Sequence, residues 1–169
     1  WDGPILTDSG GYQVFSLGGK VKIDDAGVTF QSVIDGSTHR CTPESVLTFQ
    51  KQLGPDIAMV LDHCPPGDAD LPTQRDAHER TLRWARMARD VHDRWGGSAR
   101  GQAVFGICQG GIDRELRAAS AVAMAAMDFD GYAIGGLQGW AADLLGTGAS
   151  SAFTLWLTAV IGLVACLLR

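Results

Sequence analysis

The sequence predicts an α/β fold in which parallel strands carry polar groups at their carboxyl ends, as in α/β barrels. Two observations support this fold class. Four apolar segments each run into a polar or glycine turn, at residues 4–11, 57–64, 105–111 and 132–137. Helical patterns lie between them, so the crossovers are long enough for parallel pairing. The chain has 169 residues, which suits one domain but not a complete eight-stranded barrel of about 250 residues.

The first predicted element is a short buried strand over residues 5–7, and it turns at Ser9-Gly10-Gly11. A β-hairpin follows, because residues 21–23 and 28–30 flank a polar turn at 24–27. The chain therefore adds local antiparallel structure to the strand–helix series.

A helix is predicted to open at Thr42-Pro43-Glu44. Threonine caps the helix, proline fits its first turn, and glutamate favours the positive end of the helix dipole. Gly54-Pro55 ends it. We expect its apolar face to consist of Val46, Phe49 and Leu53.

Residues 57–61 form a continuous apolar run, which is typical of a parallel strand covered on both sides. A long helix follows over 73–95. Its expected core face recurs at helical spacing and contains Ala77, Thr81, Trp84, Ala88, Val91 and Trp95. Its arginines are Arg75, Arg80, Arg83, Arg86, Arg89 and Arg94. We interpret them as a solvated face paired with nearby carboxylates, with an RNA contact as the alternative.

The third strand is predicted over residues 103–108, and the fourth over 132–134. Between them, residues 113–127 form a helix whose buried side we expect to contain Leu116, Ala119, Ala123 and Met127. The resulting order of elements is β-α-β-α-β-α-β.

The net charge and the spacing of the cysteines argue against several classes of protein. The net charge is −5, whereas a stand-alone nucleic-acid-binding domain usually has an excess of lysine and arginine. The four cysteines, Cys41, Cys64, Cys108 and Cys166, are widely spaced. They indicate neither a disulfide framework nor a zinc site, so we expect a reduced cytoplasmic compartment and no metal.

If the strands are parallel, Asp8, Asp62, Gln109 and the Gly135-Gly136 amides lie at one rim. Carboxylates accept the N–H groups of a nitrogenous base, an amide both donates and accepts, and bare glycine backbone approaches a flat ring closely. Each residue alone is also explained as a turn or a helix cap. Together, at four strand ends, they indicate a binding site.

Residues 5–14, Ile-Leu-Thr-Asp-Ser-Gly-Gly-Tyr-Gln-Val, closely resemble the signature of tRNA-guanine transglycosylases, also called queuine tRNA-ribosyltransferases. Further segments resemble that family in the same order: Gly27–Phe30, Asp35–Ser37, Thr42–Glu44, Asp62 with Cys64–Pro66, Gly106–Gly111 and Asp130–Leu137. The resemblance covers residues 1–137.

The resemblance implies an irregular (β/α)₈ barrel, of which this chain contains about four consecutive β/α units, with zinc bound elsewhere in the full-length family. It also implies an exchange of guanine at the tRNA wobble position for a 7-deazaguanine, queuine or its precursor, during queuosine modification. By position, Asp8 resembles the general acid/base. The residues that resemble the base-binding set are Asp62, Gln109, Gly136 through its backbone, and the aromatic Tyr12.

The family's nucleophilic aspartate and its zinc ligands lie beyond the match, and Asp143 is the only carboxylate after residue 137. We therefore expect a truncated chain that is inactive by itself and contains no cofactor. Its expected partners are tRNA, guanine or a 7-deazaguanine, and a second copy or a paired homologue. The alternative function is a non-catalytic partner subunit of a complete transglycosylase.

The predicted domain boundaries are 1–137 for the barrel segment, 138–151 for a linker and 152–169 for a hydrophobic tail. Residues 152–168 carry no charge, which is near the lower limit for a membrane span. One interpretation is a tail anchor on a membrane-tethered remnant. The other, which we favour, is a frameshift product or unrelated sequence.

Overall fold

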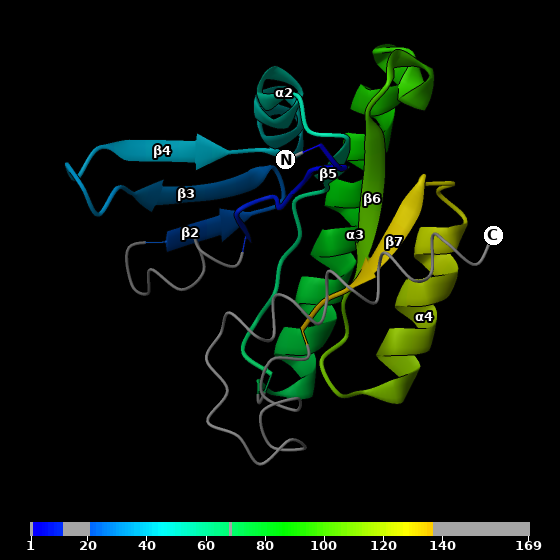
Figure 1. The fold of residues 1–169 in the computed structure, drawn as a ribbon. Coiled ribbons are helices and arrows are strands. Elements are labelled where there is room, and N and C mark those ends of the chain that lie inside the picture. The colour runs from blue at the N-terminus through cyan, green and yellow to red at the C-terminus, as the bar shows by residue number, and fades with distance from the viewer. Residues whose placement is uncertain (1, 12–20, 68, 137–169) are drawn as a thin grey trace.

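The computed structural model describes residues 2–11, 21–67 and 69–136. These residues form a parallel sheet of four strands in the order β1-β5-β6-β7 and a separate antiparallel sheet of three strands (Figure 1). The parallel strands are β1 Leu6–Thr7, β5 Ile57–Met59, β6 Ala103–Cys108 and β7 Gly131–Ile134. The mixed α/β class predicted from the sequence is confirmed. The expected linker and tail, 138–169, lie outside the described residues.

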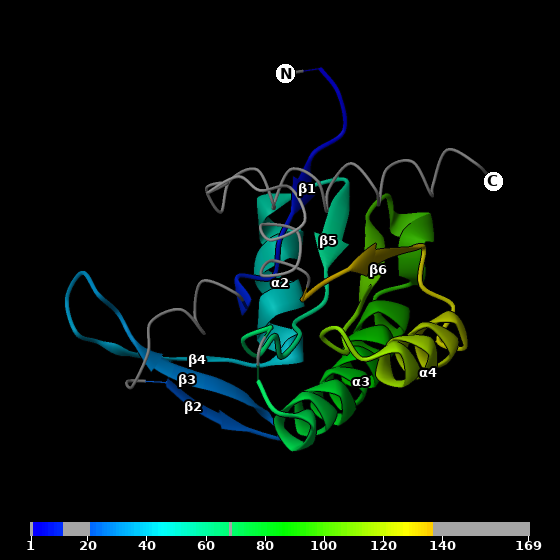
Figure 2. The same ribbon diagram turned by 90° about the horizontal axis from the view of Figure 1, so that it is seen from below.

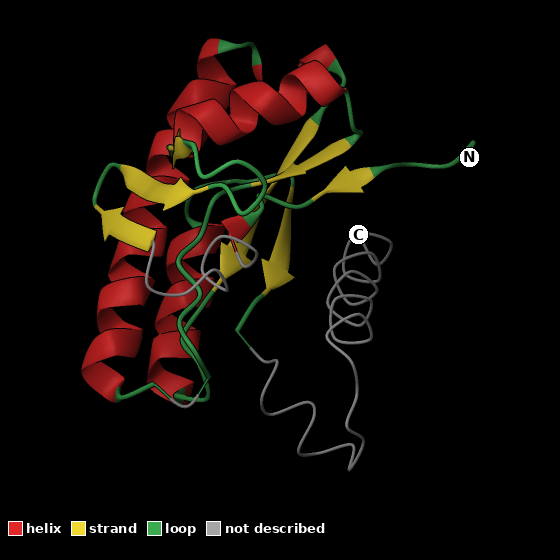
Figure 3. Ribbon diagram, turned by 90° about the vertical axis from the view of Figure 1, so that its left-hand side faces the viewer, coloured by secondary structure: helices red, strands yellow, loops and turns green. Residues whose placement is uncertain are grey.

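In the part of the chain that the structure describes, three α-helices connect the parallel strands: α2 Pro43–Leu53, α3 Leu71–Arg94 and α4 Arg114–Ala125, with a short 3₁₀ helix at Gly97–Arg100. Helices α3 and α4 cover one face of the sheet, and α2 packs beside α3 (Figures 2 and 3). The Thr42 and Asp70 side chains cap α2 and α3 by accepting hydrogen bonds from Ser45 N and Thr73 N. Among the described residues, no helix has both the length and the apolar composition needed to cross a membrane.

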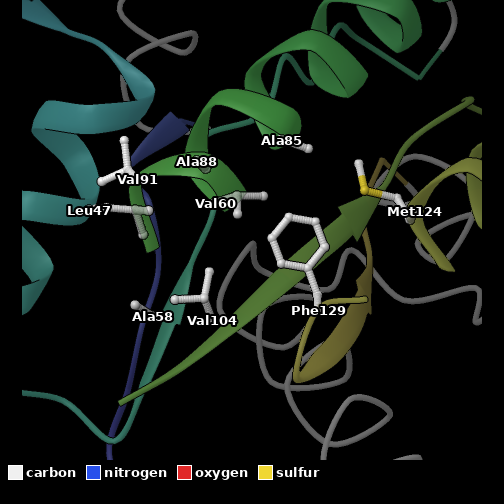
Figure 4. Close-up of a cluster of buried hydrophobic side chains, with 9 residues drawn as sticks. All are labelled: Leu47, Ala58, Val60, Ala85, Ala88, Val91, Val104, Met124 and Phe129. Carbon is white, nitrogen blue, oxygen red and sulfur yellow. The ribbon is translucent and has the colours of Figure 1, made fainter. Parts of the chain in front are cut away.

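The main core lies between the parallel sheet and the helices (Figure 4). Ala85 and Ala88 of α3 are fully buried, and their small side chains let the helix lie close to β5 and β6. The cluster consists of Leu47, Ala58, Val60, Ala85, Ala88, Val91, Val104, Met124 and Phe129. The expected core face of the long helix is largely confirmed, since Trp84 and its helical neighbours are buried. Trp95 caps the helix and is only partly buried.

The first strand differs from its prediction, because it is exposed. Ile5 and Leu6 keep 50% and 42% of their surface exposed. In the described part of the chain, β1 pairs only with β5, with Leu6 opposite Ile57. The apolar segment is therefore an edge strand and not a buried one.

The buried face of α2 also differs from its prediction. Phe49 and Leu53 are 61% and 58% exposed, whereas Leu47 and Gln50 are buried beside Val46. The Gln50 side chain accepts hydrogen bonds from Thr7 Oγ1 at 2.8 Å and Met59 N at 3.0 Å, and donates to Met59 O at 2.8 Å. These bonds satisfy a buried amide. Helix α2 therefore faces the core with the side that carries Gln50, and its more apolar side stays exposed.

Helix α4 shows the same effect. Its buried residues are Leu116, Ser120 and Met124, whereas Ala119 is exposed. The Ser120 hydroxyl accepts a hydrogen bond from Gln109 N at 3.1 Å. The buried face is therefore shifted by one residue from the predicted one, because a backbone amide at the end of β6 needs an acceptor.

The antiparallel sheet consists of β2 Val21–Asp24, β3 Gly27–Gln31 and β4 Thr38–Cys41. The predicted hairpin is confirmed as β2–β3, whereas β4 was not predicted. Trp84 of α3 holds the hairpin by donating from Nε1 to Asp25 O at 2.8 Å. The sheet extends from the helices on the side away from β7 (Figure 1).

The arginines of α3 favour the solvated-face interpretation. Arg80 pairs with Asp76 at 2.6 Å, Arg83 with Asp25 at 2.8 Å, Arg89 with Asp93 at 2.9 Å and Arg94 with Glu44 at 3.2 Å. These pairs occupy four of the six guanidinium groups within the chain, and because their carboxylates are exposed, each pair contributes little to stability.

The role of Gln50 can be tested by the substitution Gln50→Leu. It leaves the N–H and C=O of Met59 without their partners, and a buried unsatisfied group costs about 1–3 kcal/mol. We expect the free energy of unfolding to fall by about 2 kcal/mol, measured by urea denaturation. The matched control is Gln52→Leu, since Gln52 is exposed on the same helix. Equal effects of the two substitutions would contradict this account.

Candidate functional site

The polar residues that follow the parallel strands lie at one edge of the sheet. Asp8 follows β1, Asp62 lies just beyond β5, Gln109 follows β6, and Gly135-Gly136 follow β7. The strand order and parallel pairing bring these chain-distant residues together, as the sequence predicted. Tyr12, also expected in the site, lies outside the described residues.

The centre of this edge is a buried pair of side chains. Gln109 Nε2 donates a hydrogen bond to Asp62 Oδ2 at 2.5 Å, and the two residues are only 2% and 5% exposed. Burial, together with the negative charge of Asp8, raises the pKa of Asp62 to about 7, although the bond from Gln109 acts in the opposite direction. Near neutral pH the carboxyl group therefore changes readily between its protonated and ionised forms.

Two glycines lie directly against the Gln109 amide. A Cβ atom on Gly135 would be 2.5 Å from Gln109 Nε2, and one on Gly136 would be 2.5 Å from Gln109 Oε1. Gly136 also has a φ of 72°, which side chains rarely adopt. A side chain at either position would displace Gln109, so bare backbone is needed here.

Asp8 occupies the solvent side of the same edge. It is exposed, and its Oδ1 accepts a hydrogen bond from Ser9 N at 2.7 Å. Gly11 follows this turn, and a Cβ there would be 3.3 Å from Asp62 Oδ1. The turn that follows Asp8 therefore packs against Asp62.

A cavity of about 440 Å³ opens beside Asp8 and does not reach Asp62 or Gln109. Asp8, Ser9 and Gly10 form one side of it. The residues on its other sides come from α2, β3 and β4: Phe30, Cys41, Ser45, Val46, Phe49, Gln50 and Leu53. Its walls are mostly apolar, so the cavity suits a flat or hydrophobic ligand group and not a charged one.

Cys64 is buried beside the same pair. Burial raises its pKa to about 12, the negative charge of Asp62 adds to this, and hydrogen bonds from Gln109 and the Gly136 backbone oppose it. The thiol therefore stays protonated and is unsuited to act as a nucleophile. In the described part of the chain, no three histidine, cysteine, aspartate or glutamate side chains gather in a way that could hold a metal ion.

Sequence reasoning missed Arg117 and Ser120. Ser120 was detectable, because it lies at helical spacing between the apolar residues Leu116 and Met124. Arg117 donates to the carbonyl oxygens of Gly111 at 2.7 Å and Gly135 at 2.6 Å, with a longer contact to Cys108 O at 3.4 Å. No spacing pattern marks it, since its partners lie in two loops that meet only in the folded chain.

Comparison with known proteins identifies relatives of this chain. The sequence model of the queuine tRNA-ribosyltransferase family matches residues 1–146. A queuine tRNA-ribosyltransferase of Solidesulfovibrio magneticus is 53% identical over 138 residues, which are 82% of this chain and 36% of the relative. Those of Ruminiclostridium cellulolyticum and Thermotoga neapolitana are 50% and 52% identical, with the same coverage. The chain spans little more than a third of the length of these relatives.

The buried Asp62 carboxyl predicts a distinctive pH dependence of stability. Its pKa is about 7 in the folded chain against an ordinary value of 3.8. Between about pH 4 and pH 7 the folded state binds more protons than the unfolded state, so stability falls as the pH rises. Asp62→Asn removes the charge, and we expect this variant to be more stable than the wild type at pH 8 by on the order of 3 kcal/mol.

The advantage of Asp62→Asn should shrink as the pH falls toward 4 and disappear below about pH 3, where the wild-type carboxyl is protonated in both states. Urea denaturation across this pH range measures it. Asp90→Asn, at an exposed position of α3, serves as the control and should show no such trend. A stability difference that does not change with pH would contradict the assignment.

Proposed function

The chain belongs to the queuine tRNA-ribosyltransferase family, and we propose that it supplies the base-binding wall of a tRNA-guanine transglycosylase. Such an enzyme exchanges guanine at the wobble position of tRNA for a 7-deazaguanine, in queuosine modification. The observation that carries this proposal is the buried Asp62–Gln109 pair, which lies against the bare backbone of Gly135-Gly136.

The donors and acceptors of this wall complement guanine. The hydrogen-bonding edge of guanine presents an N1–H and an N2 amino group as donors and O6 as an acceptor. The ionised Asp62 accepts from the two donors, while the Gln109 amide and the Gly136 N–H donate to O6. Adenine has an acceptor at N1 and a donor at position 6, which is the reverse of guanine. Each buried mismatch costs about 1–3 kcal/mol.

A 7-deazaguanine keeps the same edge, because its change lies in the five-membered ring. One wall therefore binds both the leaving base and the incoming one. This property suits an exchange reaction, in which the two bases occupy the same place in turn.

We assign the general acid/base role to Asp8. When the bond between N9 and the ribose C1′ breaks, guanine needs a proton, and the incoming base must lose one before its N9 forms the new bond. An exposed carboxyl at this edge can give the first proton and take the second. Its hydrogen bond from Ser9 N fixes one oxygen and leaves the other for the base. By the family resemblance, Tyr12 is the aromatic residue that would pack near the base.

The four parallel strands and their outer helices correspond to about four units of a (β/α)₈ barrel in this proposal, with β1 and β7 as the edges at which it continues. The resemblance places the nucleophilic aspartate on a later strand. We therefore expect guanine exchange into tRNA only from a longer polypeptide that contains this segment. The net charge of −5 also indicates that most phosphate contacts lie elsewhere.

Base binding tests this proposal directly. We expect the chain to bind guanine at pH 8 at least about tenfold more tightly than adenine, since a tenfold ratio corresponds to about 1.4 kcal/mol. Asp62→Asn should lose this preference, whereas the control Asp90→Asn should keep it. Isothermal titration calorimetry measures both affinities. Equal affinity for the two bases in the wild type would refute the proposal.

The affinity for guanine should also depend on pH. Two N–H donors from the base favour the ionised form of Asp62, whose pKa is about 7 in the free chain. Guanine affinity should therefore fall as the pH drops below 7, and binding at pH 6.5 should release a proton. Calorimetry in buffers of different ionisation enthalpy detects this proton. Its absence in the wild type, or its persistence in Asp62→Asn, would contradict the role of Asp62.

A further inference from the structure

Arg117 differs from the paired arginines of α3. It is half-buried on α4, and in the described part of the chain it makes no ion pair with a carboxylate. Its guanidinium group instead donates to carbonyl oxygens, from Nε to Gly111 at 2.7 Å and from Nη2 to Gly135 at 2.6 Å. A cation taken partly out of water needs such partners, and here all of them are backbone groups of the loops at the site.

The bond to Gly135 determines the orientation of one peptide group. In a trans peptide the carbonyl oxygen and the following N–H point in opposite directions, and the described residues contain no cis bond. Arg117 holds the Gly135 oxygen on the α4 side. The N–H of Gly136 therefore faces the site, where it hydrogen-bonds with the Cys64 sulfur.

This peptide would turn easily without a restraint. Both residues are glycines, so no side chain opposes rotation of the peptide between them. After such a rotation a carbonyl oxygen would face the site in place of an N–H. The carbonyl oxygen of this peptide would then face guanine O6, and because both atoms are acceptors, no hydrogen bond could form between them.

We infer that Arg117 is a positioning residue, which holds the Gly135–Gly136 peptide with its N–H toward the base and thereby sets the recognition of O6. This inference rests on the proposed function. The contact of Arg117 with Gly111 O also holds the other glycine loop, directly after Gln109, whereas the Gln109 side chain itself is held by Asp62.

The test compares two bases that differ at a single atom. In 6-thioguanine, sulfur replaces O6 and is a weaker acceptor, while the N1 and N2 donors remain. We expect Arg117→Met to lower the affinity for guanine at least about tenfold and the affinity for 6-thioguanine less than about threefold. Arg117→Lys should fall between the wild type and Arg117→Met, because an ammonium group cannot span both loops. Arg114→Met, at an exposed position of α4, is the control.

A merely structural role would weaken the binding of both bases equally, and that result would overturn the inference. So would an unchanged guanine affinity in Arg117→Met. Amide hydrogen exchange gives a second measurement that needs no base. The Gly136 amide should exchange at least about tenfold faster in Arg117→Met than in Arg114→Met, while the amide of Val104 in β6 keeps its rate.

These two measurements separate the inference from the proposed function. If the wild type bound neither base, the proposed function would fail. The exchange rate of the Gly136 amide would still decide whether Arg117 positions this peptide, and an unchanged rate would overturn the positioning role.

Discussion

The structure depends on how the backbone at the ends of its parallel strands finds hydrogen-bond partners. Each helix that packs on the sheet provides one buried polar side chain for this purpose. Gln50 of α2 bonds both backbone groups of Met59, Thr81 of α3 accepts from His63 N, and Ser120 of α4 accepts from Gln109 N. Because a buried backbone group without a partner is costly, these three contacts fix the strand ends and the helices together.

The site follows from this constraint, since its residues leave the strands at the points that the helices hold. Asp62 and Gln109 are both buried, so their mutual hydrogen bond forms away from water. A buried carboxylate with few donors is unfavourable in the free chain, which its raised pKa reflects. A ligand that brings two N–H groups would offset that cost, so binding and ionisation of Asp62 are coupled.

In the proposed function, base recognition depends on backbone orientation as much as on side chains. Asp62 provides the acceptor, but the complementary donor at Gly136 exists only if its peptide faces the site. Arg117 lies outside the expected base-binding set and yet holds that peptide from behind. Positions 135 and 136 are glycines because a side chain at either one would collide with Gln109. In the proposed function, helix α4 therefore contributes to base recognition through Arg117.

The sequence by itself determined the four parallel strands, the Thr42 cap of α2 and the residues of the rim, because apolar runs, capping residues and turn glycines act locally, and parallel strands share one edge. It did not determine which faces of α2 and α4 are buried, and Phe49, Leu53 and Ala119 were wrongly placed in the core. Nor did it indicate β4, the exposure of β1 or the role of Arg117. The tertiary structure decided these features, because each depends on a backbone partner or a neighbouring strand from a distant part of the chain.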